Sequence, residues 1–388
     1  MKSRASITAA VTLAFGSLAL AETPRPAPVI QVGVDVIRID ATVTDKSGRP
    51  VTDLRPEDFR LEIDGKPVTV ENAAFFGRTA AADGALQDGA VSEAAQSGPD
   101  RSIVFLIDDL NLGPSSAYWT RRALQTFASR LQSEQAMIGV RFTSDESDTV
   151  RLSRNPARFD AAIDGFRYNP RSAREFDRSH FQQRIYSLLT TINALRSAPG
   201  RKTVILVTDG LSVESMPDSR RQLWIDSPFD SLFADRNTDA AQRMIVEIAS
   251  RASTVIHTIY PSGTLTPWRT GSGDAEAPLG AEVVASLAAR EVRQEFDELA
   301  SATGGLALVN RNSLERALAR VVEDQRSYYL IGFEPPQSTF SKPGQPRFHK
   351  IKLTIDRPGV RARTRAGFYG VTDQVVVARA PLSEPTIR

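Results

Sequence analysis

Two apolar runs in the sequence end in aspartate. Residues 105–112 read FLIDDLNL, so that Asp108 and Asp109 follow one run, and residues 204–211 read VILVTDGL, so that Asp209 follows the other. Short apolar runs are typical of buried strands, and the carboxyl ends of parallel strands meet at one edge of a sheet. We therefore expect the three carboxylates to lie close together.

Carboxylate and amide oxygens are the ligands that Mg²⁺ and Ca²⁺ prefer. Asn111 could add an amide oxygen, and Ser115 or Ser116 a hydroxyl, to a site built on Asp108, Asp109 and Asp209. The alternative is that Asp108 and Asp209 only cap neighbouring helices or accept hydrogen bonds from loop amides. Both interpretations stay open at this point.

The elements that must position these residues lie between residues 101 and 323. Strand-like runs such as SIVFLID, MIGVRFT, KTVILVTDG, TVIHTIY and LALVN alternate there with amphipathic stretches of helical period. Trp119, Ala123, Phe127 and Leu131, for example, recur near helical spacing. Strands that are apolar throughout, each followed by a helix, predict a doubly wound, mostly parallel α/β sheet with helices on both faces.

The segments on either side of this region have the period-2 alternation of strands. Residues 30–77 include a hairpin with Asp64-Gly65 at its tip, and residues 326–370 alternate in the same way. The two ends of an inserted domain usually lie close together, so the segments that flank it can pack against each other. We therefore predict one β-sandwich-like domain built from both segments, with the α/β domain inserted between them. Residues 78–100 are expected to be a surface linker, and residues 371–388 a tail.

The first residues predict export. Lys2 and Arg4 precede the apolar run ITAAVTLAFGSLAL, and Ala19-Leu20-Ala21 supplies a small-x-small cleavage pattern, so residues 1–21 have the features of a signal peptide. An N-terminal membrane anchor is the alternative. No later run is long enough for a transmembrane helix. We therefore predict a periplasmic or secreted protein with no membrane span once the signal is removed.

Composition excludes several classes of function. The 388 residues contain no cysteine, which rules out disulfides and thiol chemistry, and the formal charge of +2 indicates no surface for nucleic acid or anionic lipid. The histidines are scattered, and the mature chain has no phosphate loop or Gly-x-Ser-x-Gly motif. A non-catalytic binding protein is favoured; the alternative is an exported hydrolase whose active site has no recognisable motif.

The order of these motifs resembles a von Willebrand factor A domain. IVFLIDD, GRKTVILVTDG and VIHTIY occur in that family's order. The flanking segments VTDKSGRPVTDLRPEDFRLEIDGKPVTV and RFHKIKLTIDRPGVRARTRAGFYG are similar to those of the bacterial "VWFA-related" exported proteins abundant in Acidobacteria. The resemblance covers roughly residues 30–372. It implies a protein-binding module, with an unknown protein of the cell envelope or extracellular space as partner.

The resemblance also implies a metal-ion-dependent adhesion site (MIDAS), in which Asp-x-Ser-x-Ser, a threonine and a later aspartate hold a cation. Asp108 and Asp209 match the two aspartates, whereas Leu110 and Leu112 stand at the serine positions, and the expected threonine loop has no counterpart. The site is therefore degenerate. No cofactor is expected beyond a weakly bound Mg²⁺ or Ca²⁺ on Asp108, Asp109, Asn111 and Asp209.

Two long insertions follow strands of the predicted sheet and should lie at the same edge as the aspartates. They cover residues 212–238 and 261–280 and carry arginine and tryptophan side chains that could anchor a partner. These candidates are Arg220, Arg221, Trp224, Trp268 and Arg269. The alternative is that both insertions are only spacers.

Overall fold

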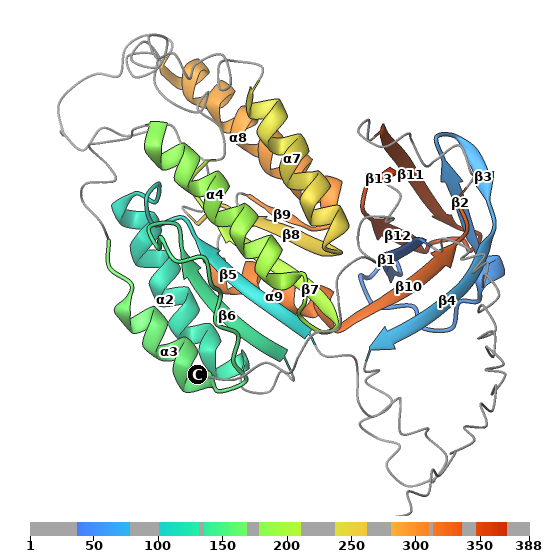
Figure 1. Ribbon diagram of the computed structural model, residues 1–388, viewed down its shortest axis with the longest axis horizontal. Coiled ribbons are helices and arrows are strands. Elements are labelled where there is room, and N and C mark those ends of the chain that lie inside the picture. Colours follow the sequence, from blue (N-terminus) through green and yellow to red (C-terminus); the bar gives the residue numbers. More distant parts are fainter. Residues whose placement is uncertain are drawn as a thin grey trace, which may run out of the picture. The chain divides into compact units, whose positions relative to one another are not determined.

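The computed structural model describes residues 37–77, 101–131, 136–168, 178–210, 237–261, 281–309, 313–335 and 347–370. Among these residues, five parallel strands form a sheet in the order β6-β5-β7-β8-β9 (Figure 1). The strands are β5 (Arg101–Ile107), β6 (Ala136–Phe142), β7 (Arg201–Val207), β8 (Thr254–Ile259) and β9 (Ala307–Leu308). The order changes direction at β5 and β7, which places the ends of these two central strands side by side.

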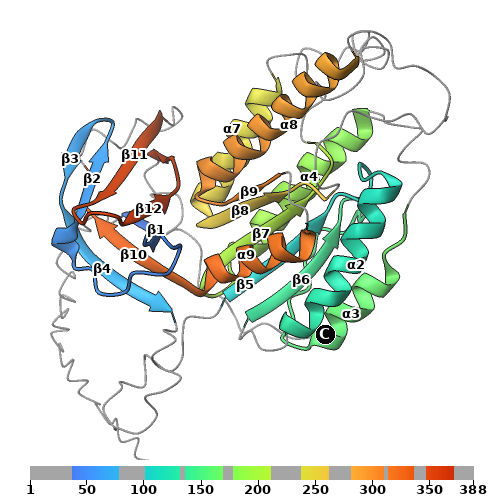
Figure 2. The ribbon, with the colours of Figure 1, turned by 180° about the vertical axis from the view of Figure 1, so that it is seen from behind.

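Helices cover both faces of this sheet (Figures 1 and 2). Helices α2 (Pro114–Leu131), α3 (Pro156–Gly165) and α9 (Leu314–Arg326) share one core with alternate residues of β5, including Phe105. Helices α4 (Arg178–Leu195), α7 (Asn237–Arg251) and α8 (Ala281–Thr303) share the other core with the intervening residues, including Leu106. The period of two in the strands thus sorts side chains between two apolar layers. The predicted doubly wound fold is confirmed.

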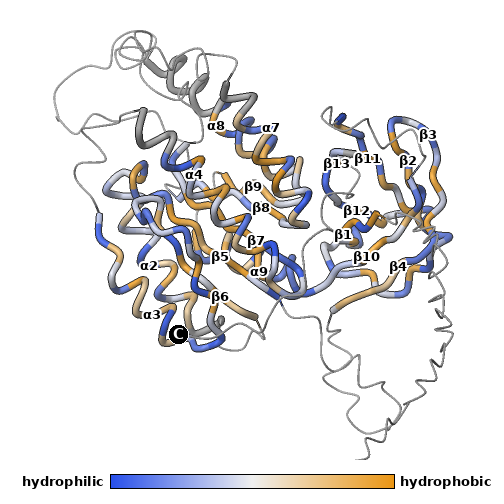
Figure 3. The backbone as a smooth tube through the Cα atoms, viewed as in Figure 1, coloured by the Kyte–Doolittle hydropathy of each residue, from blue (hydrophilic) through white to orange (hydrophobic). Residues whose placement is uncertain are grey.

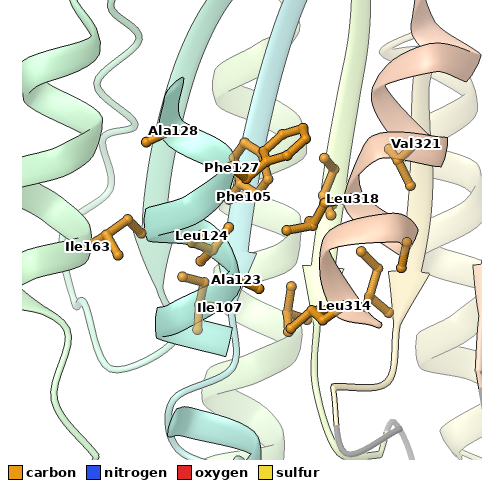
Figure 4. Packing of buried hydrophobic residues seen from close by; sticks show 14 of the residues in the cluster. Phe105, Ile107, Ala123, Leu124, Phe127, Ala128, Ile163, Leu314, Leu318 and Val321 are labelled. Atoms are coloured by element: carbon orange, nitrogen blue, oxygen red, sulfur yellow. The ribbon is translucent and has the colours of Figure 1, made fainter. Parts of the chain in front are cut away.

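The first of these cores is filled by aromatic and branched side chains. Phe105 and Phe159 meet edge to face with ring centroids 5.3 Å apart, and Leu124 and Leu318 are buried beside them. Figure 4 shows side chains from β5, α2, α3 and α9 converging there, and Figure 3 shows the apolar character of the central strands. Each such side chain contributes roughly 1.5–3 kcal/mol when fully buried, so the central strands and their ends are held rigidly.

The remaining strands form a sandwich of two antiparallel sheets, with orders β12-β1-β10-β4 and β13-β11-β2-β3. The N-terminal segment contributes β1 (Ile37–Thr44), η1 (Pro56–Asp58), β2 (Phe59–Ile63), β3 (Lys66–Val68) and β4 (Val70–Gly77). The C-terminal segment contributes β10 (Ser327–Phe333), β11 (Arg347–Ile355), β12 (Arg361–Thr364) and β13 (Gly367–Gly370). Each sheet mixes strands from both segments, so the predicted two-part β domain is confirmed.

Two local features connect the sandwich to its sequence. Asp64 and Gly65 have φ angles of 51° and 77°, as a type I′ hairpin between β2 and β3 requires. Tyr329 lies in the apolar core between the sheets, and its hydroxyl accepts a hydrogen bond from the Leu54 amide at 3.0 Å. The alternation of apolar residues thus brings sequence-distant strands onto one core.

The helix predicted around Trp119, Ala123 and Phe127 is present as α2. Trp119 lies outside its apolar face, since Trp119 is 47% exposed whereas Ala123 and Phe127 are buried. The apolar face of the helix instead includes Leu124, because a rotation of about 100° per residue places Trp119 beside it and not within it. Within the described ranges, no helix has both the length and the apolar character needed to cross a bilayer.

Candidate functional site

The carboxyl edge of the parallel sheet contains a buried ion pair. Asp108 follows β5 and is fully buried, and its Oδ2 lies 2.8 Å from Nε of Arg184, which projects from α4 and is equally buried. Arg184 also donates through Nη1 to the carbonyl oxygen of Gly210 at 2.8 Å. A guanidinium stays protonated in proteins and supplies the counter-charge of the carboxylate.

Two threonine hydroxyls complete the surroundings of Asp108. Thr208 Oγ1 donates to Asp108 Oδ2 at 2.6 Å, and Thr143 Oγ1 lies 2.9 Å from Asp108 Oδ1. Burial raises the pKa of Asp108 above its ordinary value, and Arg184 and the two hydroxyls oppose that rise. Both oxygens of Asp108 are therefore engaged by protein groups.

Asp109 shares Thr143 with Asp108 and has Ser144 as its other partner. Its Oδ1 lies 3.0 Å from Thr143 Oγ1 and accepts from the Ser144 amide at 3.0 Å, while its Oδ2 accepts from the Ser144 hydroxyl at 2.5 Å. Thr143 and Ser144 directly follow β6, so these contacts tie the turn after β5 to the turn after the neighbouring strand. Asp109 is buried with its hydrogen bonds satisfied by this turn.

Asp209 holds the start of α2. Its Oδ2 accepts from the Gly113 amide at 2.8 Å, and its Oδ1 accepts from the Ser116 hydroxyl at 2.7 Å. Asn111 donates through Nδ2 to the Gly210 carbonyl at 3.1 Å. Ser115, the other serine considered, is exposed. A carboxylate at the N-terminal end of a helix stabilises the unpaired amides there.

The structure brings all the predicted metal ligands to one edge, but their arrangement does not fit a cation. Leu110 and Leu112 are buried, at 8% and 1% exposure, so the two positions that matched serines face the core. A divalent ion placed against Asp108 would lie beside the Arg184 guanidinium and be repelled by it. Among the described residues, no group of three or more carboxylate, histidine or cysteine side chains could hold a metal.

Arg184 is the residue that the sequence reasoning missed, although a signal was present. In α4 the buried residues Ser187, Leu188, Thr191, Ile192 and Leu195 recur at helical spacing. Arg184 falls on the same face, one turn before Ser187 and Leu188. An arginine in the apolar stripe of a helix must find a buried acceptor, because an unpaired buried charge is strongly unfavourable.

An exposed aromatic cluster lies on α2 near this edge. Tyr118 is 57% exposed and Trp119 47%, and their rings meet edge to face with centroids 5.1 Å apart. Arg122 lies over the Trp119 ring at 5.8 Å and donates to the Tyr118 hydroxyl at 3.4 Å. Ser116, two residues before Tyr118, contacts Asp209, which fixes this end of α2 to the sheet edge. The cluster was not among the sites predicted from the sequence.

The predicted partner-binding residues lie outside the described residues. Arg220, Arg221 and Trp224 belong to residues 211–236, and Trp268 and Arg269 to residues 262–280. The described ends of these segments, Gly210 and Pro261, follow β7 and β8. Gly210 and Pro261 themselves lie at the carboxyl edge of the sheet.

No protein-family model matches the chain, and no curated protein matches it either. Among solved structures, proximal thread matrix protein 1 from the mussel byssus is similar, with 14% identity, a TM-score of 0.29, and coverage of 59% of this chain and 46% of its own. Another structure of that protein, described with a zinc-occupied MIDAS motif, is 13% identical with the same TM-score and coverage.

The PilB minor pilin from Streptococcus sanguinis is also similar, with 11% identity, a TM-score of 0.31, and coverage of 60% of this chain and 61% of its own. The match to the mussel protein covers less than half of that protein's length. Identities and TM-scores this low support no inference about a site or a partner.

Proposed function

We propose that this chain is an exported, non-catalytic protein-binding module that docks its partner at the carboxyl edge of the parallel sheet without a cation. The observation that carries the proposal is the ion pair of Arg184 with Asp108, 2.8 Å long and fully buried. The arginine supplies the positive charge that a divalent ion would otherwise bring to this carboxylate. Recognition then rests on side chains around the pair, in an adhesion or scaffold role.

The described part of the docking surface is the cluster of Tyr118, Trp119 and Arg122. Exposed aromatic and arginine side chains are the residue types most enriched at the energetic centres of protein interfaces. The residues of the two insertions, Arg220, Arg221, Trp224, Trp268 and Arg269, belong to the same proposal because their segments start at this edge. The proposed partner is a protein of the cell envelope or extracellular space. Residues 1–21 are proposed as the export signal of this chain.

Membership in the VWFA-related exported proteins is part of this proposal and rests on the motifs quoted above. A hydrolase is the competing function. An active site requires a nucleophile, a base and an orienting group in reach of one another. Among the described side chains, His257 contacts the Leu306 amide and Gln325, and His349 contacts Asp64, so neither histidine is paired with a hydroxyl nucleophile. This supports binding over catalysis.

The test is capture of envelope proteins by the immobilised chain, with and without EDTA. We expect a specific set of proteins to be retained in EDTA and lost from the Tyr118→Ala/Trp119→Ala variant. The matched control is Met244→Ala, which removes a 50% exposed apolar side chain from α7. Deletion of residues 214–236 tests the first insertion in the same assay.

Two results would contradict the proposal. Capture that requires Mg²⁺ or Ca²⁺, with micromolar cation affinity in calorimetry that Asp108→Ala abolishes, would show a working metal site. Turnover of a peptidase, esterase, glycosidase or phosphatase substrate that Asp209→Ala abolishes would show a hydrolase. Sequencing the N-terminus of the protein isolated from the periplasm or medium tests the export signal.

A further inference from the structure

A cavity of about 280 Å³ lies at the amino ends of β7 and β8, opposite the edge described above. The described residues all belong to one compact unit, and this cavity is lined by strands of the sandwich together with helices and strands of the α/β domain. Its charged lining consists of Arg38, Arg201 and Arg365, with Asp40 as the one carboxylate. Three cationic groups therefore share a single anionic partner in the lining.

Arg201 is the most buried of the three. Its guanidinium lies 4.8 Å from the centroid of the Tyr328 ring and donates through Nη1 to the Asp324 carbonyl at 3.1 Å. Its Nε is 3.7 Å from Asp40 Oδ2, too far for a good hydrogen bond, and among the described residues this buried nitrogen has no hydrogen-bond partner. Arg201 is thus fixed by its other contacts, while its Nε–H remains able to donate a hydrogen bond to a ligand.

Arg365 has the same incomplete pairing. It donates through Nη1 to the Ser250 carbonyl at 3.1 Å and through Nη2 to the Arg38 carbonyl at 3.0 Å, both of which are neutral acceptors. Its Nε is buried with no hydrogen-bond partner among the described residues. Burial lowers the pKa of Arg365 to about 10, and Asp40 opposes this shift. The carboxylate of Asp40, which also lies near Arg201, does not fully offset the free-energy cost of burying the Arg365 guanidinium.

The second carboxylate near the cavity is already engaged. Asp324 Oδ1 accepts a close hydrogen bond from Arg363, and its Oδ2 is 4.0 Å from Arg201. Lys202 adds a further positive charge near Asp40. The rest of the lining includes apolar side chains, among them Phe76, Val246 and Leu330. A positive cavity with apolar walls attracts anions strongly, because nearby charges are poorly screened there.

We propose that this cavity binds a small organic anion, whose oxyanion group (carboxylate or phosphate) is held by Arg201 and Arg365 and whose short apolar body packs on Phe76 and Leu330. Guanidinium groups suit this role because they bind planar and tetrahedral oxyanions through paired N–H donors. Arg38, the third arginine of the lining, is exposed. Pockets between domains are common ligand sites, and ligand binding here would stabilise the junction.

The experiment titrates the full chain with benzoate, phenyl phosphate and inorganic phosphate, by calorimetry and thermal denaturation, at constant ionic strength. Benzamide serves as the neutral counterpart. We expect saturable binding of the organic anions and not of benzamide, and a weaker response to inorganic phosphate. A preference between benzoate and phenyl phosphate identifies which oxyanion the arginines select.

Three variants assign the binding to the cavity. Arg365→Gln should weaken the affinity about tenfold or more, the value of one charge-assisted hydrogen bond. Arg38→Gln should weaken it by less, because it removes one positive charge from the lining and no direct contact to the oxyanion. Arg158→Gln, which removes an exposed arginine from α3, should leave the affinity unchanged. Absence of saturable binding to every anion, or equal weakening by Arg158→Gln, would overturn the proposal. Arg38→Gln keeps the test valid if Arg365→Gln does not fold, because Arg38 is exposed.

Discussion

The two ends of the parallel sheet each bury an arginine among carboxylates, but they do so differently. At the carboxyl edge, Arg184 lies 2.8 Å from Asp108, and threonine hydroxyls engage both oxygens of that carboxylate. At the amino end, Arg201 lies 3.7 Å from Asp40 and 4.0 Å from Asp324, beside further arginines and a cavity. The short Arg184–Asp108 contact balances the arginine with a carboxylate, whereas the looser group at the amino end has excess positive charge that a ligand could neutralise.

The largest expected effect comes from breaking the carboxyl-edge pair. Arg184→Met leaves Asp108 buried without its counter-charge, and we expect the free energy of unfolding to fall by about 3–5 kcal/mol. Urea denaturation at neutral pH measures this. Adding Asp108→Asn to Arg184→Met should recover part of the loss, because no uncompensated charge then remains. A loss below about 1 kcal/mol, the scale of an exposed pair, would show that the contact is not a buried ion pair.

Breaking the amino-end group should cost less. Arg201→Met removes hydrogen bonds to the Asp324 carbonyl and to Thr42, yet Asp324 keeps Arg363 and Asp40 keeps Arg365 nearby. We expect a loss of about 2–3 kcal/mol in the same denaturation assay. If Arg201→Met lowered the free energy of unfolding more than Arg184→Met does, the proposed contrast between the Arg184–Asp108 pair and the arginine group at the amino end would be wrong.

Acid should weaken the amino end through His257. This side chain is fully buried beside Gln325, and burial lowers its pKa from 6.5 to about 3. The unfolded chain therefore binds a proton between these values that the folded chain does not, so stability falls as the pH drops below 6.5. Between pH 7 and pH 5 the wild type should lose about 2 kcal/mol more than His257→Gln. Parallel losses in both proteins would contradict the assignment.

The smallest effect should come from the hydrogen bond that fixes α2 to the carboxyl edge. Ser116→Ala removes the 2.7 Å contact to Asp209, while Asp209 keeps the Gly113 amide. We expect a loss of about 1 kcal/mol, the usual contribution of one hydrogen bond. Trp119→Ala is the control, since its exposed side chain should change stability even less. A larger loss in the control would show that the aromatic cluster supports the fold.

Much of the fold followed from periodicity in the sequence, and the candidate site followed only in part. Uninterrupted apolar runs such as VILV predicted buried strands, and the aspartates after them were expected at one edge, as found. The partners of these aspartates could not be predicted, because Thr143, Thr208 and Arg184 are distant in sequence and reach Asp108 only through tertiary packing. The resemblance implied a threonine loop with no counterpart in the sequence, whereas Thr143 and Thr208 directly follow strands β6 and β7.

The sandwich joins the two ends of the described chain, which has a consequence for its biogenesis. The Thr364 hydroxyl bonds the Asp40 carbonyl across 324 residues, and Leu54 bonds Tyr329 across 275. β1 and β2 therefore have no strand partners from the C-terminal segment until nearly all of the chain has been synthesised, and unpaired strand edges aggregate readily. The inserted α/β domain can fold first and bring the flanking segments together, which lowers the entropy cost of closing so long a loop. Pairing of β10 to β13 with these strands is thus the last step of folding, and a chain cut before Ser327 would leave its first strands unpaired and exposed to proteases.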